Sequence, residues 1–295
     1  DKGRQLPTPE MAPGVLMVAE KPSLAQSIAQ FLSEGQMQTR RGQLEVHEYY
    51  GQFQGRQAFF KMTSVIGHVY SIDFTAQYQN WDTTDPATLF HADTVKAEAN
   101  PKARVCSHLQ REAKGCDYLV LWLDCDREGE NICFEVMENT VKYMRPLGPG
   151  QQQVFRARFS AISAPEMKAA MSNLTVPNKN EALAVDARQE LDLKMGVAFT
   201  RFQTRYFQGK YGNLDSSVIS YGPCQTPTLS FCVERQQRIA CFVPEPYWSV
   251  KGRLMHQGVS VTLEWERGRL FDRDIATALH KNVADAGVAE VTDVS

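Results

Sequence analysis

The first half of the chain alternates between short apolar runs and longer stretches in which apolar residues recur with helical spacing. The short runs are typical of buried strands and lie at residues 15–19, 118–123 and 154–159. Polarity alternates between residues 46 and 64, around Gly51 and Gly55, which predicts a hairpin. Helices are predicted near residues 20–33, 101–113 and 128–143. Strands that alternate with helices predict a mainly parallel sheet with helices on both faces.

From Ala164 onward the pattern becomes helical and then changes again. Helices are predicted near residues 164–173, 180–209 and 226–240. After Pro244 and Pro246 the chain returns to strand-like segments at 247–254 and 259–265, a helix near 273–283 and a last strand near 288–293. We therefore predict an α/β, Rossmann-like domain at 15–163, a helical domain at 164–241 and the start of a mixed, β-rich domain at 242–295. Residues 1–14 are polar and rich in proline, as in a disordered extension or a tag remnant.

Composition narrows the function classes only a little. The chain has 295 residues, 43% of them hydrophobic and 22% charged, which is typical of globular proteins. Its formal charge of −2 means that any nucleic acid would have to be bound by local basic patches. The seven cysteines form no Cys-x-x-Cys pair, which favours free thiols in a reducing compartment. Since no apolar run approaches the roughly 20 residues of a membrane span, we expect a soluble, intracellular protein without membrane contact.

Candidate chemistry is concentrated directly after the apolar run at 118–123. Four carboxylates follow within seven residues: Asp124, Asp126, Glu128 and Glu130. Ligands gather at the carboxyl ends of strands in open α/β sheets, and crowded carboxylates need a cation there. Hard oxygen ligands favour Mg²⁺. The alternative is a solvated acidic turn at a helix N-terminus, which explains one or two acids better than four. Glu20 ends the first strand and is expected at the same edge.

Basic residues gather in the second predicted helix of the helical zone. Residues 188–210 hold five basic residues and two acidic ones. Lys194, Arg201 and Arg205 have the spacing i, i+7 and i+11, which predicts one stripe along a helix. Such a stripe could follow the phosphates of a single strand, or it could be a solvated face. Arg188 could pair with Asp192 at i+4.

Six short sequence motifs, taken in their order along the chain, resemble those of a known protein family. The pattern Asp-x-Asp-x-Glu at 124–128, with Glu20 after the first strand, resembles the Toprim domain of topoisomerases, bacterial primases and some nucleases. The other segments are Val18–Ser23, Gly67–His68, Arg156–Phe159, Ala187–Asp192 and Gly222–Leu229. Six ordered motifs are specific jointly. Together they resemble the N-terminal half of type IA DNA topoisomerases, closest to eukaryotic topoisomerase III. The segment 219–229, with Pro223 and Thr226, resembles the beta form more than the alpha form.

The resemblance implies an activity and a role for each motif. In this family a tyrosine attacks one strand to form a 5′-phosphotyrosyl bond, a second strand passes, and the break is resealed. Glu20 would handle the proton of the 3′-oxygen, and Lys21 would stabilise charge on the phosphoryl group. Asp124, Asp126 and Glu128 would hold Mg²⁺. The residues implied to contact nucleic acid are His68, Arg156, Arg188, Lys194, Arg201, Ser220, Gln225 and Thr226.

The resemblance also implies partners and a location. Single-stranded DNA is the expected substrate, and the likeness to the beta form adds RNA as a second one. A Tudor-domain protein is the expected partner, and the nucleus the expected location, with the cytoplasm as a second.

The family nucleophile is not found in this chain. Tyr221 follows Ile219 and Ser220, as the nucleophile would, but Gly222 and Pro223 then open the separate DNA-binding motif. We therefore expect the nucleophile beyond Ser295, and expect the 295 residues alone to bind nucleic acid and Mg²⁺ without cleavage. Two alternatives stay open. A Toprim nuclease or nucleotidyl transferase needs no tyrosine, and a non-catalytic scaffold would only bind single strands.

Overall fold

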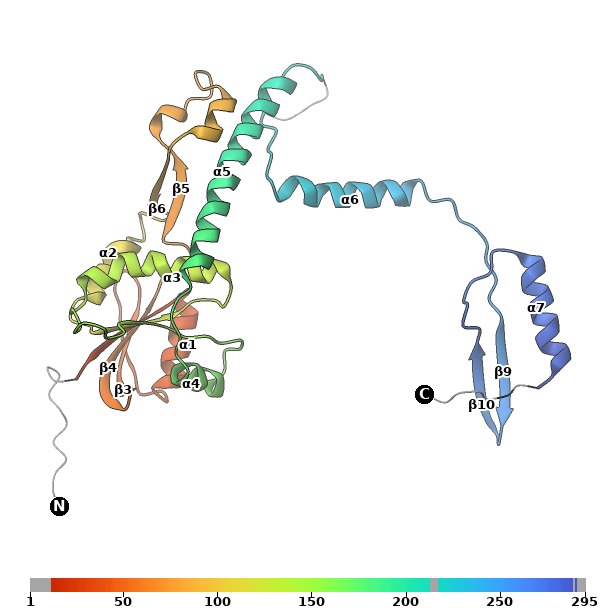
Figure 1. Ribbon diagram of the computed structural model, residues 1–295, viewed down its shortest axis with the longest axis horizontal. Coiled ribbons are helices and arrows are strands. Elements are labelled where there is room, and N and C mark those ends of the chain that lie inside the picture. The colour runs from red at the N-terminus through yellow and green to blue at the C-terminus, as the bar shows by residue number, and fades with distance from the viewer. Residues whose placement is uncertain (1–11, 213–216, 289, 291–295) are drawn as a thin grey trace. The chain divides into compact units, whose positions relative to one another are not determined.

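The computed structural model describes residues 12–212, 217–288 and 290. The chain forms two compact units, and the boundary between them in the sequence lies between Thr226 and Pro227. Figure 1 shows the elements of each unit. Among the described residues, no helix combines the length and the apolar character that crossing a membrane requires.

A six-stranded sheet forms the centre of the first unit, in the order β2-β3-β4-β1-β7-β8. Strand β1 pairs in parallel with β4 on one side and with β7 on the other, and β7 pairs in parallel with β8. The hairpin β3–β4 and the short β2 add antiparallel pairs at one edge. The mainly parallel sheet is therefore confirmed. The bounds are Gly14–Ala19 for β1, Gln38–Arg40 for β2, Val46–Phe53 for β3, Arg56–Ser64 for β4, Tyr118–Trp122 for β7 and Val154–Arg156 for β8.

Both faces of this sheet are covered by helices, which explains why β1 and β7 are apolar throughout. Alternate residues of a strand point to opposite faces, so Val15 and Met17 lie in one core while Leu16 lies in the other. Helix α1 (Pro22–Leu32) and helix α4 (Ala164–Ser172) contribute to the first core. Helix α2 (Val105–Ala113) and helix α3 (Arg127–Thr140) contribute to the second, and the turn η3 (Val141–Tyr143) follows α3.

One part of the first unit is not predicted by the sequence pattern. Residues 70–98, which we name the excursion, form a small antiparallel sheet of β5 (Tyr70–Phe74) and β6 (Thr94–Glu98). Between them lie the 3₁₀ turns η1 (Ala76–Tyr78) and η2 (Pro86–His91). The excursion lies beside the long helix α5 (Lys179–Phe207), as Figure 1 shows. The two share a small core of Phe74, Leu89, Ala92 and Ala198.

The second unit contains a hairpin and a helix. Strands β9 (Lys251–His256) and β10 (Val259–Glu264) pair in antiparallel fashion, and helix α7 is Arg273–Ala286. Helix α6 (Gln225–Ala240) begins just before the boundary between the units. The predicted last strand falls largely on residues 289 and 291–295, outside the described part of the chain, as does most of the predicted extension at 1–14.

The structure corrects one predicted helix start and leaves one predicted domain boundary untested. The helix predicted from 101 begins only at Val105, because Arg104 takes a left-handed conformation with φ 49° and separates the preceding turn from the helix. The separate helical domain at 164–241 stays a prediction. Helix α4 packs on α1 within the first unit, and α5 packs on α3.

Candidate active site at the carboxyl edge of the sheet

The ends of β1 and β7 bring together three charged side chains. Ala19 and Trp122 are register partners in these neighbouring parallel strands, so Glu20 and Asp124 leave the sheet at the same edge. The backbone N–H of Asp124 donates to Glu20 Oε2 at 3.3 Å. Lys21 Nζ lies 3.5 Å from Glu20 Oε1 and 4.0 Å from Asp124 Oδ2. The predicted meeting of Glu20 with the acidic loop is therefore seen in the structure.

These three side chains differ in exposure, and the difference sets what each can do. The Glu20 side chain is 14% exposed, whereas Lys21 is 61% and Asp124 47% exposed. A sheltered carboxylate can exchange a proton with a group held at the mouth of the site. The exposed ammonium can meet a phosphate without moving away from Glu20.

Asp126 and Gly129 fix the turn from β7 into α3. Asp126 Oδ1 accepts from the N–H of Gly129 at 2.8 Å and so caps the helix. A Cβ at position 129 would lie 1.9 Å from the carbonyl oxygen of Asp124, so only glycine allows this close approach. The acidic loop therefore depends on Gly129 for its shape.

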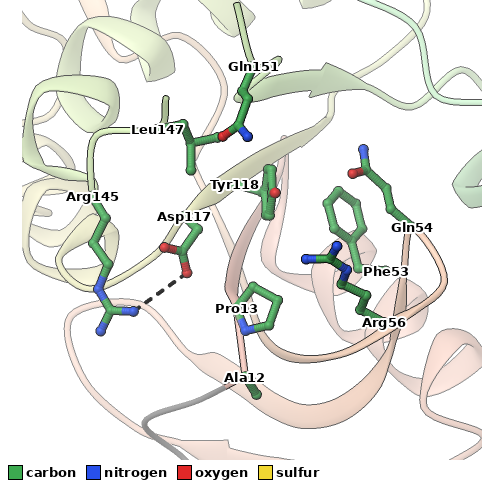
Figure 2. Close-up of a pocket in the computed structure, with 10 residues that line it drawn as sticks. All are labelled: Ala12, Pro13, Phe53, Gln54, Arg56, Asp117, Tyr118, Arg145, Leu147 and Gln151. Atoms are coloured by element: carbon green, nitrogen blue, oxygen red, sulfur yellow. Dashed lines mark ion pairs between the residues drawn. The ribbon is translucent and has the colours of Figure 1, made fainter. Parts of the chain in front are cut away.

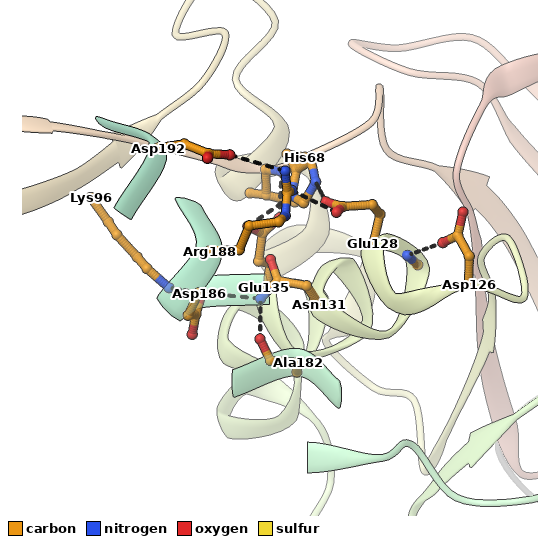
Figure 3. A network of polar contacts seen from close by, with 12 residues as sticks. His68, Lys96, Asp126, Glu128, Asn131, Glu135, Ala182, Asp186, Arg188 and Asp192 are labelled. Carbon is orange, nitrogen blue, oxygen red and sulfur yellow. Dashed lines mark hydrogen bonds and ion pairs between the residues drawn. The ribbon is translucent and has the colours of Figure 1, made fainter. Parts of the chain in front are cut away.

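Glu128 points into a network of charges that connects three segments (Figure 3). Its carboxylate lies 3.0 Å from His68 Nε2 and accepts from Arg188 Nη2 at 2.6 Å. The other ring nitrogen of His68, Nδ1, lies 3.3 Å from Glu135 Oε1. The hydrogen bond to Glu135, aided by Glu128, raises the pKa of His68. Glu128 thus joins α3 to α5 and to the segment before β5.

The acidic loop fits Mg²⁺ by the chemistry of its donors. Asp124 and Asp126 offer hard carboxylate oxygens, and Mg²⁺ commonly takes one or two protein carboxylates with water and phosphate. Within the described residues, however, no three His, Cys, Asp or Glu side chains are arranged as a metal site. Both carboxylate oxygens of Glu128 have partners in His68 and Arg188. The set Asp124, Asp126 and Glu128 stays a prediction as a Mg²⁺ site.

A cavity of about 470 Å³ lies away from this chemistry, at the opposite edge of the sheet (Figure 2). It is lined by Pro13 before β1 and by Asp117 and Tyr118 at the start of β7. Asp117 is paired with Arg145 at 3.7 Å and accepts from the N–H of Gly14. These contacts hold the amino ends of the strands in place, so we assign this cavity no part in the candidate site.

Comparisons with known proteins agree with the geometry. A family model described as the Toprim domain matches residues 15–162, about half of the chain. A model described as DNA topoisomerase matches residues 176–295. The chain belongs to the Toprim-containing DNA topoisomerases. Within them it is a type IA, topoisomerase III beta-like sequence, which confirms the resemblance drawn from the motifs.

Sequence identity to this chain is higher for relatives of the beta form than for those of the alpha form. The chain is 60% identical over 285 residues to DNA topoisomerase 3-beta of Oryza sativa, covering 97% of this chain and 33% of the relative. Identity to human DNA topoisomerase 3-beta-1 is 57% over 267 residues, which cover 89% and 31%. Human DNA topoisomerase 3-alpha is 40% identical over 284 residues, which cover 95% and 28%. The chain therefore spans about a third of the length of these relatives.

A solved structure supports the fold. Full-length topoisomerase I from Thermotoga maritima superposes with a TM-score of 0.51 at 20% identity, over 90% of this chain and 37% of that one. At this identity the likeness speaks for the fold alone.

Arg156 is a correction to the nucleic-acid contacts predicted for this topoisomerase chain. Its side chain is 0% exposed and pairs with the equally buried Glu130, Nε to Oε1, at 2.9 Å. Its Nη1 donates to the carbonyl of Leu123 at 2.8 Å, and its Nη2 to that of Asp124 at 2.7 Å. Arg156 thus holds the end of β7 and the acidic loop from beneath and does not face nucleic acid. Glu130 is its counter-ion and not a member of an exposed acidic cluster.

Arg201 is a second correction. The residue is only 3% exposed. Its Nη1 donates to the carbonyl of Tyr78 at 2.7 Å, and its guanidinium lies over the Trp81 ring, 5.4 Å from the centroid. Burial, reinforced by the neighbouring Arg205, lowers the pKa of Arg201. Arg201 therefore joins α5 to the excursion, and the face that the stripe predicted for phosphate is covered there.

The other predicted contacts are at least partly exposed. Arg188 pairs with Glu128 and, as the spacing suggested, with Asp192 at 3.2 Å. Lys194 pairs with Glu190 at 2.7 Å within α5. Gln225 and Thr226 are exposed at the start of α6, and Ser220 is exposed five residues before it. Their contacts with nucleic acid stay predictions.

Some residues of the network carry no sequence signal. Asn131 donates to the carbonyl of Ala182 and to Asp186 Oδ1, both at 3.0 Å, and Lys96 reaches the same Asp186 at 2.9 Å (Figure 3). The partners lie 51 to 90 residues apart in the chain. No local pattern could have connected them, because the pairing depends on how α5 packs on α3.

Proposed function

We propose that this chain supplies the Toprim part of the catalytic site of an enzyme that cleaves, passes and reseals single strands of DNA. The juxtaposition of Glu20, Lys21 and Asp124 at one sheet edge carries the proposal, together with the two family matches. Glu20 gives and takes the proton of the 3′-oxygen. Lys21 stabilises the charge on the phosphoryl group during transfer. Asp124 and Asp126, with Glu128 if it releases Arg188, would hold Mg²⁺, which would position the phosphate and neutralise its charge.

The nucleophile in this proposal is a tyrosine from outside this chain. Tyr221 is unsuitable because its ring packs on Phe199, with centroids 4.9 Å apart, and its N–H donates to Thr200 Oγ1. Thr200 lies twelve residues beyond Arg188 in α5, about 18 Å along the helix axis. Tyr221 is therefore held far from the acidic loop that Arg188 contacts.

The finer parts of the proposal rest on the likeness to the beta form. They are RNA as a second substrate, a Tudor-domain protein as the partner, and a nuclear location with the cytoplasm as a second. Two other functions are distinguished by their products. A Toprim nuclease would release a free 5′-phosphate without a protein–DNA adduct, and a scaffold would bind single strands without turnover.

The test is formation of a covalent adduct. The 295 residues alone should give no adduct with a labelled single-stranded oligonucleotide, and a longer chain that includes the nucleophile should give one on denaturing gels. In the longer chain Glu20→Gln should slow cleavage and resealing by roughly 10²–10⁴-fold, since the 3′-oxygen loses its proton partner.

Two controls make this result specific. Glu138→Gln removes an exposed carboxylate from α3 and should leave the rate unchanged. Tyr221→Phe should leave the adduct intact. An adduct mapped to Tyr221, or free 5′-phosphate ends without any adduct, would overturn the proposal.

A further inference from the structure

A row of exposed aromatic rings lies along the C-terminal half of α5 and the adjoining η2. We name it the aromatic strip, which consists of the exposed Phe90, Phe199, Phe202, Tyr206 and Tyr211 together with the partly buried Phe207. Tyr211 lies four residues beyond the end of α5 and packs on Phe207. Phe202 is 56% exposed, Tyr206 50% and Tyr211 55%. Scattered apolar residues are normal on a surface, but a contiguous row of them marks a binding face.

The rings of the strip are arranged as a continuous surface. Phe199, Phe202 and Tyr206 have the spacing i, i+3 and i+7 and so share one face of α5. Phe202 and Tyr206 are stacked, with planes 18° apart and centroids 5.9 Å apart. Phe90 meets Phe199 edge-on at 6.0 Å, and a cavity of about 310 Å³ opens between these two rings and Phe202.

The charges around the strip favour an anionic ligand. Residues 193–212 contain no acidic residue and four basic ones, of which Arg205 and Lys210 are exposed, whereas Arg201 is buried and Lys194 pairs with Glu190. Lys210 Nζ lies 3.2 Å from the centroid of the Tyr206 ring. Asp85 also lines the cavity, and its carboxylate accepts from the N–H of Ala87 at 3.0 Å and so caps η2. The cationic end of the strip is therefore the end at Tyr206 and Lys210.

We propose that the aromatic strip stacks the bases of single-stranded nucleic acid, with Lys210 beside the phosphates. Exposed rings with a neighbouring cation match a ligand that has flat bases and a charged backbone. The ligand class rests on the proposed function, but the site does not coincide with the acidic loop. Tyr206 lies 18 residues beyond Arg188 in α5, about 27 Å along the axis, so these bases are remote from the reacting phosphate.

The test separates stacking from electrostatic attraction. Binding of a fluorescent oligonucleotide of about 12 nucleotides is compared with binding of the same oligonucleotide carrying abasic sites, which has equal charge. The native 295-residue chain should bind the intact strand about tenfold more tightly. Phe202→Leu combined with Tyr206→Leu keeps the apolar area but removes the ring faces, and should abolish this preference.

Matched variants complete the test. Tyr206→Phe should keep the preference, and Tyr50→Leu, which alters a half-exposed ring on β3, should also keep it. The thermal midpoint should be unchanged in all of them, because the rings replaced are exposed. Leucine variants that retain the preference, or that lose affinity equally for both strands, would overturn the proposal and leave an apolar protein partner as the occupant.

Failure of this proposal and failure of the proposed function can be told apart. Glu20→Gln should leave the preference for the intact strand unchanged. In the longer chain, the leucine variants should still form the adduct when the oligonucleotide is saturating. If the native 295-residue chain prefers the intact strand but the longer chain forms no adduct, only the proposed function is refuted. If the longer chain forms the adduct but the native chain shows no preference for the intact strand, only the proposal about the aromatic strip is refuted.

Discussion

The loop after β7 and the helix α5 both carry charged residues that the sequence singles out, yet they place these charges differently. In the loop, Asp124 is half exposed and the arginine that supports it, Arg156, is buried beneath. In α5, Arg201 is buried against the excursion, whereas the side chains of Arg188 and Asp192 are about half exposed. The comparison shows that a strand end fixes the position of a carboxylate locally, whereas the position of an arginine depends on segments far away in the chain.

The largest expected effect comes from breaking the buried ion pair of Arg156 and Glu130 beneath the loop. Arg156→Met should destabilise the first unit by about 3 kcal/mol, because the buried Glu130 loses its buried counter-ion and keeps only the partly exposed Arg158 and the N–H of Asn178 as partners. Chemical denaturation followed by circular dichroism measures the loss.

Two variants show whether the burial of Arg156 causes that loss. Arg158→Met removes a guanidinium that is 45% exposed and should cost less than about 1 kcal/mol. Arg156→Met combined with Glu130→Gln should recover part of the lost stability, since the uncompensated charge is removed. Equal losses for the two single variants would mean that burial does not distinguish them.

The second test concerns the arginine of α5. Arg201→Met removes the hydrogen bond to the Tyr78 carbonyl and the contact with Trp81, which together should cost about 2 kcal/mol. The loss should appear as faster amide hydrogen exchange in the excursion, residues 70–98. The salt dependence of single-strand binding should not change, because a buried guanidinium neutralises no phosphate.

Lys194→Met is the matched control for Arg201→Met. Its ammonium pairs with Glu190 on the same helix, so exchange in the excursion should stay unchanged. A flatter salt dependence for Arg201→Met, with exchange unaltered, would restore Arg201 as a phosphate contact and reverse the comparison.

The sequence could predict those features of the molecule that depend on local patterns along the chain. The apolar runs and the helix that starts after Asp126 are local signals, and they place Glu20 and Asp124 at one sheet edge without knowledge of the rest of the chain. The excursion could not be predicted, because its strands are short and only one of their residues, Phe74, is buried. Arg156 and Arg201 could not be distinguished from surface arginines, because their partners Glu130 and Tyr78 are supplied by packing.

Unlike these charged side chains, one buried histidine, His108, is held in its neutral form. His108 on α2 is 0% exposed. Its Nε2 lies 2.8 Å from Thr63 Oγ1, whose hydroxyl donates to the carbonyl of Glu45 at 2.9 Å. Arg111 Nη2 donates to its Nδ1 at 3.0 Å. This arrangement fits an imidazole with one proton, on Nε2, and leaves no room for a second proton on Nδ1.

The smallest expected effect is therefore a pH dependence. Burial, aided by the charges of Arg111 and Arg40 and opposed by Glu112, lowers the pKa of His108 to about 4. The unfolded chain binds this proton near its usual pKa of about 6.5, so stability is fully present above that pH and is lost as the pH falls toward about 4. From about pH 7 to about pH 5.5 the native chain should lose about 1 kcal/mol more than His108→Gln, measured by denaturation at each pH. His91→Gln removes an exposed histidine and should lose as much as the native chain over this interval. If His108→Gln showed the same loss as the native chain, the histidine would not be the group that titrates, and its neutral, buried state would be refuted.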